Sequence, residues 1–106
     1  MQSSSRKLES VLGCKWSVSV LLAVDNGFIR PGILEKHIDG ISKKVLSERL
    51  RKLTAYGLLA KQTFPEVPPR TEYSLTPFGK KLMGIIEQIQ ILDAELESTS
   101  DNSSEL

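Results

Sequence analysis

The segment from Gly40 to Leu75 constrains the fold most, because its hydrophobic period changes once along its length. The stretch GISKKVLSERLRKLTAYGLL carries apolar residues at the spacing of an amphipathic helix: Val45, Leu46, Leu50 and Leu53. Ser42 is a suitable N-cap for this helix, and Gly57 is a suitable C-terminal stop. The stretches LLAKQTF and TEYSL, on either side of the proline-rich PEVPPR, are typical of two strands. The segment therefore predicts a helix followed by a β-hairpin.

Helices are predicted on both sides of this segment. Upstream, KLESVLGCKWSVSVLLAVDNG indicates one helix or two helices broken near Gly13. FIR is compatible with a very short strand, and RPGILEKHIDG indicates a further helix. Downstream, Thr76 can cap a last helix whose first position is Pro77, where a missing N–H is tolerated. The order helix, helix, helix, hairpin, helix predicts a winged helix-turn-helix, a mainly α fold with a small β-hairpin wing.

The last predicted helix carries an apolar stripe with positions three and four residues apart: Leu82, Ile85, Ile89, Leu92 and Leu96. No second long helix is predicted to cover this stripe, so we expect a second copy of the chain to cover it. The alternative is that the stripe packs against the helix's own domain. We expect one domain over residues 1–97 and a disordered acidic tail over residues 98–106.

Positive charge is concentrated in the middle of the chain. Residues 30–81 carry eleven Lys or Arg against five Asp or Glu, a net charge of +6. Residues 82–106 carry six acidic groups and no basic ones. A cationic centre of this kind favours a polyanionic partner.

Composition also disfavours other classes of function. One cysteine, Cys14, and one histidine, His37, allow neither an internal disulfide nor a multi-cysteine zinc site, so no metal or other cofactor is expected. No nucleophile is paired with a base and no glycine loop could hold a phosphate, so the chain is not expected to be an enzyme. Apolar runs fall short of the ~20 residues of a membrane helix, and MQSSSRKLES lacks the apolar stretch of a signal peptide. We therefore expect a cytoplasmic protein with no membrane partner.

The helix predicted over about residues 42–56 has a polar side opposite its leucines: Lys44, Ser47, Glu48 and Arg51, with Lys43 and Lys52 at the edges. In a helix-turn-helix, this side of the second helix enters the major groove of DNA. Lys can donate to guanine O6 and N7, and Ser can contact a base or a phosphate. Lys61 and Arg70 of the wing, about residues 60–75, suit phosphates or the minor groove. We therefore predict DNA contacts from Ser42, Lys43, Lys44, Ser47, Arg51, Lys61 and Arg70.

Three stretches, KWSVSVLL, GISKKVLSERLRKLTAYGLL and PEVPPRTEYSLTPFGKKL, closely resemble the HxlR-type transcriptional regulators, which are winged-helix proteins related to the MarR group. The resemblance covers about residues 13–90. It implies a bacterial homodimer that binds double-stranded DNA at a near-palindromic operator and represses or activates transcription. It also implies that the first and last helices form the dimer interface. On this resemblance, Lys43, Lys44, Ser47 and Arg51 lie on the recognition helix and Arg70 lies in the wing.

The chain departs from the family pattern at its cysteine. Members that sense oxidants or electrophiles typically carry a cysteine in a CP segment upstream of the KW, where this chain has RKLESVL. Cys14 instead directly precedes Lys15 and Trp16, so a sensing role does not transfer by position. Lys15 can lower the pKa of the thiol and make Cys14 a redox sensor. The alternative is a small buried residue beside the dimer interface.

Two questions about partners stay open at the level of the sequence. The first is whether a small effector molecule or an oxidant is a further partner. The second is whether the basic face docks an acidic protein instead of DNA, since a fold alone does not decide function. Dependence of DNA affinity on base sequence, rather than on charge alone, distinguishes these two functions.

Overall fold

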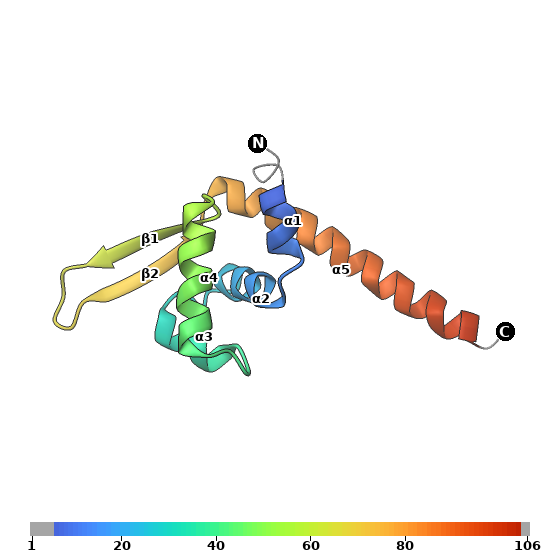
Figure 1. The fold of residues 1–106 in the computed structure, drawn as a ribbon, viewed down its shortest axis with the longest axis horizontal. Helices are drawn as coiled ribbons and strands as arrows, with labels where there is room; N and C mark the ends of the chain where they lie inside the picture. The colour runs from blue at the N-terminus through green and yellow to red at the C-terminus, as the bar shows by residue number, and fades with distance from the viewer. Residues whose placement is uncertain (1–5, 105–106) are drawn as a thin grey trace.

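A computed structural model of the chain describes residues 6–104 and confirms the predicted fold class (Figure 1). Along this part of the chain, four helices are followed by one antiparallel hairpin and then by a fifth helix. They are α1 (Lys7–Leu12), α2 (Lys15–Asp25), α3 (Pro31–His37), α4 (Lys43–Ala55), β1 (Leu59–Phe64), β2 (Arg70–Leu75) and α5 (Pro77–Ser104). The predicted first helix is therefore two helices, and the break falls at Gly13 and Cys14. Helices α3 and α4 form the helix-turn-helix, and the hairpin is the wing.

The hydrophobic core lies between α2, α3, α4 and the first residues of the hairpin. Helix α2 contributes Val20, Leu21 and Val24, whose spacing of one and three residues places them on one side of a helix. Helix α4 contributes Leu46, Leu50 and Leu53, as its sequence pattern predicts. The largest fully buried side chains also include Leu34 of α3 and the pair that follows α4, Leu58 and Leu59.

Both ends of α4 have the local chemistry that its sequence predicts. The hydroxyl of Ser42 accepts a hydrogen bond from the backbone N–H of Val45 at 3.1 Å, which satisfies one of the free N–H groups of the first turn. Gly57 follows the helix with a φ of 76°, a left-handed conformation that favours glycine. Helix α4 is therefore fixed at both ends by local interactions.

The wing is a regular hairpin in which Leu59 pairs with Leu75 and Phe64 pairs with Arg70. The short strand expected at FIR is wrong: the segment 28–30 belongs to neither strand. A single backbone bond, from Tyr73 N–H to the carbonyl of Ile29 at 2.9 Å, joins this segment to β2. Because Pro31 begins α3 immediately afterwards, the extended segment ends before a ladder of such bonds can form.

Helix α5 begins at the predicted N-cap. The hydroxyl of Thr76 accepts from the N–H of Gly79 at 2.9 Å and donates to the carbonyl of Gly57 at 2.5 Å. The helix continues to Ser104. Residues 98–104, which were expected to belong to a disordered tail, are therefore helical. Residues 85–104 contain neither glycine nor proline, so no local signal ends the helix there. Residues 105–106 of the expected tail lie outside the described part.

The wing and α5 extend from the body in opposite directions, which gives the molecule extents of 62 × 36 × 23 Å (Figure 1). Helix α4 crosses between them and is exposed along one side. Within residues 6–104, no helix has both the length and the apolar character needed to cross a membrane.

Candidate nucleic-acid interface

The outer side of α4 is a polar surface rich in positive charge. Lys44, Ser47, Glu48 and Arg51 are exposed opposite the buried leucines, and Lys43 is exposed at the edge of this side. None of the ion pairs among the described residues involves a residue of α4. The structure therefore brings three predicted residues, Lys44, Ser47 and Arg51, onto one accessible side of a single helix, with the exposed Lys43 at its edge.

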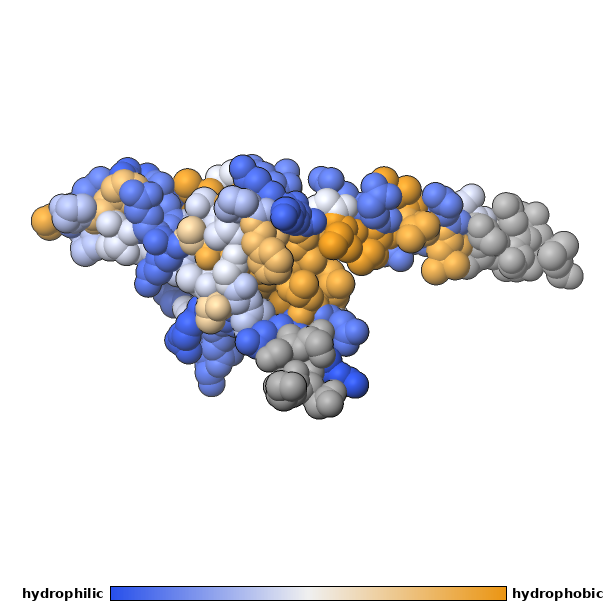
Figure 2. All heavy atoms as spheres, turned by 90° about the horizontal axis from the view of Figure 1, so that it is seen from above, coloured by the Kyte–Doolittle hydropathy of each residue, from blue (hydrophilic) through white to orange (hydrophobic). Residues whose placement is uncertain are grey.

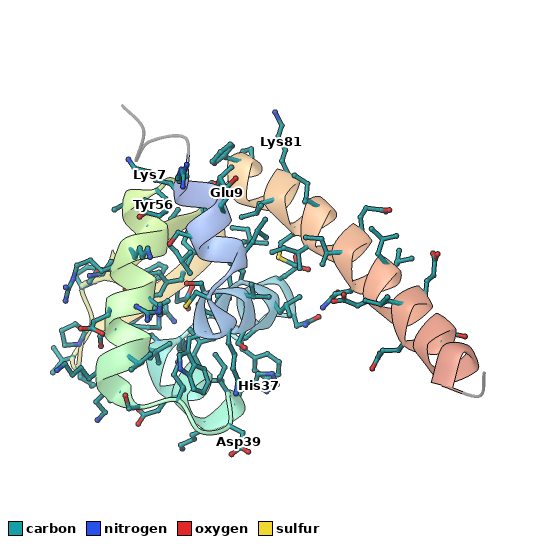
Figure 3. The ribbon with its side chains drawn as sticks, turned by 45° about the vertical axis from the view of Figure 1, so that its right-hand side comes forward. Lys7, Glu9, His37, Asp39, Tyr56 and Lys81 are labelled. Atoms are coloured by element: carbon teal, nitrogen blue, oxygen red, sulfur yellow. The ribbon has the colours of Figure 1, made fainter. Side chains whose placement is uncertain are left out.

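Other polar residues of α4 are engaged within the protein. Lys52 lies 3.3 Å from the Ser10 hydroxyl, and its ammonium lies 5.8 Å from the centre of the Tyr56 ring. Lys7 of α1 lies over the same ring at 5.4 Å (Figure 3). Ser42 is exposed, but its hydroxyl already caps the helix. These contacts attach α1 to the C-terminal half of α4 and leave the N-terminal half free.

A groove separates α4 from the wing. It has a volume of about 450 Å³ and is lined from α4 by Ser47, Arg51 and Thr54 and from the wing by Lys61 and Tyr73. Tyr73 is buried at the base of the groove, and burial raises the pKa of its phenol. Arg51 and Lys61 thus face one hollow from two different elements.

The two predicted wing cations have different surroundings. Lys61 is exposed on β1, opposite Tyr73 in the register. Arg70 is half-buried and paired with two carboxylates, those of Glu66 at 3.2 Å and Glu72 at 3.5 Å. Its guanidinium also lies 4.1 Å from the centre of the Phe64 ring. The spacing of Arg70 and Glu72 along one strand places both on the same face, whereas Phe64 reaches Arg70 across the hairpin, for which sequence spacing gives no signal.

Cys14 lies at the N-cap position of α2 and is half-buried. The pKa of its thiol is about 7, below the ordinary 9.0: burial raises it, but Ser17, Arg49 and the Trp16 backbone favour the thiolate more strongly. Lys15, expected from the sequence to lower this pKa, instead lies 4.9 Å over the Trp16 ring. Arg49, which is half-buried on α4, has an enclosed Nε without a hydrogen-bond partner in the described chain.

The predicted stripe on α5 divides between two environments. Leu82 is buried in the core of its own domain, as are Met83 and Ile86, which the stripe does not include. The remaining members are exposed: Ile85, Ile89, Leu92 and Leu96. In Figure 2, apolar residues gather where α5 leaves the body and continue along the helix. Beyond its first turns, α5 thus carries a large uncovered apolar surface.

Three further basic residues lie away from this groove. His37 stacks on Phe28 with ring centres 3.7 Å apart, which accounts for it without a phosphate or a metal (Figure 3). Lys80 and Lys81 are exposed in the first turn of α5, and Lys81 points away from the body. These residues therefore add no cation to the side of α4.

Comparison with known proteins gives consistent results. The sequence pattern of the HxlR-like helix-turn-helix family matches residues 11–100. A protein of Methanothermobacter thermautotrophicus, named an uncharacterized HTH-type transcriptional regulator, is 34% identical over 94 residues, which are 89% of this chain and 72% of that protein.

Solved structures agree with this relationship. A transcriptional regulator of the MarR family from Enterococcus faecalis V583 has a TM-score of 0.79 and 32% identity, over 99% of this chain and 93% of that one. The reduced form of the redox regulator HypR has a TM-score of 0.74 and 30% identity, over 81% of this chain and 85% of that one. The matched proteins are transcriptional regulators rather than enzymes. The chain therefore belongs to the HxlR-like helix-turn-helix family of DNA-binding transcriptional regulators, as its sequence motifs and its fold both indicate.

Proposed function

We propose that the protein acts as a homodimer on a near-palindromic operator, with α4 in the major groove and the wing on the backbone or the minor groove. The observation that carries the proposal is the outer side of α4, where Lys43, Lys44, Ser47 and Arg51 are exposed and unpaired in the described structure. Two such helices related by a twofold axis would enter successive major grooves. The half-sites would then lie ~34 Å apart, or a multiple of that distance.

The side chains of α4 support distinct roles. Lys43 and Lys44 lie in the first turn of the helix, the part that approaches base edges in this motif. Arg51 lies two turns later beside the groove, where it and Lys61 suit neighbouring phosphates. The Ser42 hydroxyl is used as the helix cap, so a direct DNA contact from this residue would come from its backbone N–H.

Alanine at Lys44 and at Arg51 tests the interface. We expect Lys44→Ala to weaken binding to the operator by about 1–3 kcal/mol if it contacts a base. Arg51→Ala should lower the slope of log affinity against log salt by about 0.9 if it contacts a phosphate. Fluorescence anisotropy measures both on DNA from upstream of the protein's own gene, with a shuffled duplex as the comparison. Lys81→Ala is the matched control, because this exposed lysine points away from the body.

Docking of an acidic protein partner by the same basic face is the less favoured function. It predicts equal, charge-dependent binding to the operator and to the shuffled duplex. Unchanged affinity in both the Lys44 and Arg51 variants would contradict the assignment of α4 as the recognition helix.

We also propose a role for Cys14 as an oxidant-sensitive residue. Its lowered pKa supports this role, because the thiolate is the form that attacks an oxidant such as peroxide. The similarity to HypR, which is known in reduced and oxidised forms, supports it further. Peroxide or diamide should then change DNA affinity in the unmodified protein but not in Cys14→Ser. Unchanged affinity, with no intersubunit disulfide on a non-reducing gel, would contradict the role.

A further inference from the structure

The ion pairs of the described residues gather at the wing. Arg70 Nη2 lies 3.2 Å from Glu66 Oε2, and Arg70 Nε lies 3.5 Å from Glu72 Oε2. Glu72 Oε2 lies in turn 3.6 Å from Nε of Arg30. Four side chains of alternating charge, Glu66, Arg70, Glu72 and Arg30, thus follow one another, and we call them the wing chain.

The wing chain connects segments that belong to different parts of the fold. Glu66 lies in the loop between the strands, Arg70 and Glu72 lie on β2, and Arg30 directly precedes α3. The backbone bond from Tyr73 to Ile29 lies beside the pair of Glu72 and Arg30 and joins the same two segments. The loop of the wing is therefore connected through side chains to the first helix of the helix-turn-helix.

The side chain of Arg70 makes more contacts within the protein than a side chain that only binds a DNA phosphate would need. Its planar guanidinium contacts two carboxylates and the face of Phe64, its cross-strand neighbour. Its Nε is enclosed and has no hydrogen-bond partner in the described structure, and the carboxylate of Glu72 lies 3.5 Å from it as an ion pair. Lys61 differs in each respect: it is exposed on β1, and none of the ion pairs of the described residues includes it.

We infer that Arg70 is a positioning residue that fixes the direction of the wing through the wing chain, and that Lys61 supplies the wing's phosphate contact. The inference rests on the proposed binding of DNA and assigns different roles to the two wing cations. A wing whose direction is fixed before binding loses less conformational freedom on binding. The wing chain thereby favours association without contacting the DNA itself.

Hydrogen exchange of the free protein tests the positioning role without DNA. Arg70→Gln and Glu72→Gln should each speed exchange of the β1 and β2 amides by about two- to fivefold, as expected for partly exposed ion pairs. The double variant should exchange no faster than the single ones, because both changes remove the same link. Arg70→Lys should behave like Arg70→Gln, since a lysine cannot reproduce the two-carboxylate fork. Lys61→Gln is the matched control, with unchanged exchange; unchanged exchange in the Arg70 and Glu72 variants would overturn the inference.

The salt dependence of DNA binding tests the division of roles. With a labelled duplex of mixed sequence, Lys61→Gln should lower the slope of log affinity against log salt by about 0.9. Arg70→Gln should weaken binding and leave the slope as it is in the unmodified protein. A lowered slope in Arg70→Gln, matching that of Lys61→Gln, would show a phosphate contact and overturn the inference. If the unmodified protein shows no salt-dependent binding to DNA, the proposed function and the role of Lys61 are both overturned. Hydrogen exchange would still decide whether Arg70 fixes the direction of the wing.

Discussion

Cys14 shows how a single residue acquires its chemistry from its neighbours. The pKa of its thiol is about 7 instead of 9.0, since Ser17, Arg49 and the Trp16 backbone together outweigh the effect of burial. The rate of alkylation by iodoacetamide should therefore rise as the pH rises through about 7 and level off before pH 9.0, whereas in urea it should still be rising there. Because the folded pKa is the lower one, ionised Cys14 stabilises the folded state fully above pH 9.0, and this contribution is lost as the pH falls through about 7.

Ser17→Ala is the matched variant for this measurement. It removes a hydroxyl that favours the thiolate and leaves the sulfur in place, so the midpoint of the alkylation profile should move towards 9.0. A midpoint that stays at about 7 in this variant would contradict the assigned cause.

Ser42 caps α4 and, in the proposed complex, lies beside the DNA; substitution can separate these two roles. Ser42→Ala removes the acceptor for the Val45 N–H and should cost about 1 kcal/mol of unfolding free energy, measured by urea denaturation. Ser42→Asp keeps a good cap and should preserve this stability, but it adds a negative charge beside the proposed DNA phosphates. We therefore expect Ser42→Asp to lose DNA affinity at unchanged stability, and equal affinity in both variants would contradict a position next to DNA.

The residues that the sequence identified correctly are those whose role is local. Ser42 and Thr76 are caps, and their partners lie three residues ahead, within the same helical turn. Arg70 differs in part, because Phe64 reaches it only through the register of the hairpin, whereas Glu72 lies two residues along the same strand. Arg49 likewise reaches Cys14 only through the packing of α2 on α4, whereas Ser17 lies three residues ahead of Cys14 in the first turn of α2. Lys15 is not among the causes of the lowered pKa.

At the scale of elements, the junction between α4, β1 and α5 depends on one glycine. A Cβ on Gly79 would collide with the backbone carbonyl of Leu58, and it would also lie 3.2 Å from Leu75. Gly79→Ala should therefore lower the unfolding free energy by about 1–3 kcal/mol, because neither backbone segment can move away freely.

Gly84 of the same helix is the matched control, since a Cβ there would meet nothing within 4 Å. Gly84→Ala should stabilise the protein by about 0.5–1 kcal/mol through the lower entropy of the unfolded chain. Thermal denaturation measures both variants. Equal stability in the two would contradict the close approach of α5 to Leu58.

The side of α5 that faces the domain illustrates what sequence spacing leaves open. The stripe of leucines and isoleucines predicts an apolar side, but it cannot decide how far the domain extends along it. Packing places Leu82, Met83 and Ile86 against the core, whereas Ile89, Leu92 and Leu96 remain exposed. The predicted end of this helix was wrong for a different reason. The polar composition of its last residues suggested disorder, yet no glycine or proline interrupts residues 85–104 and α5 continues to Ser104.

At the scale of the molecule, the protruding half of α5 is the feature that a monomer explains least. Isolated helices of this length are marginal in water, and most helical stability in proteins comes from packing of an apolar face. Ile85, Ile89, Leu92 and Leu96 form such a face, and each is at least 38% exposed. A second copy of the same helix would cover it, which agrees with the symmetric assembly that the proposed near-palindromic operator would require.

Aspartate in the exposed stripe tests the dimer. Ile89→Asp and Leu92→Asp should each shift the protein from dimer to monomer in sedimentation velocity, because a charge buried in an apolar interface is strongly unfavourable. Operator affinity should fall in the same variants, since each monomer reaches only one half-site. Ile91→Asp is the matched control: Ile91 is 52% exposed on the same helix, but its position lies off the stripe. If Ile91→Asp dissociates the dimer while Ile89→Asp and Leu92→Asp leave it intact, the interface lies on another side of α5. If the unmodified protein is itself a monomer, the dimer is contradicted.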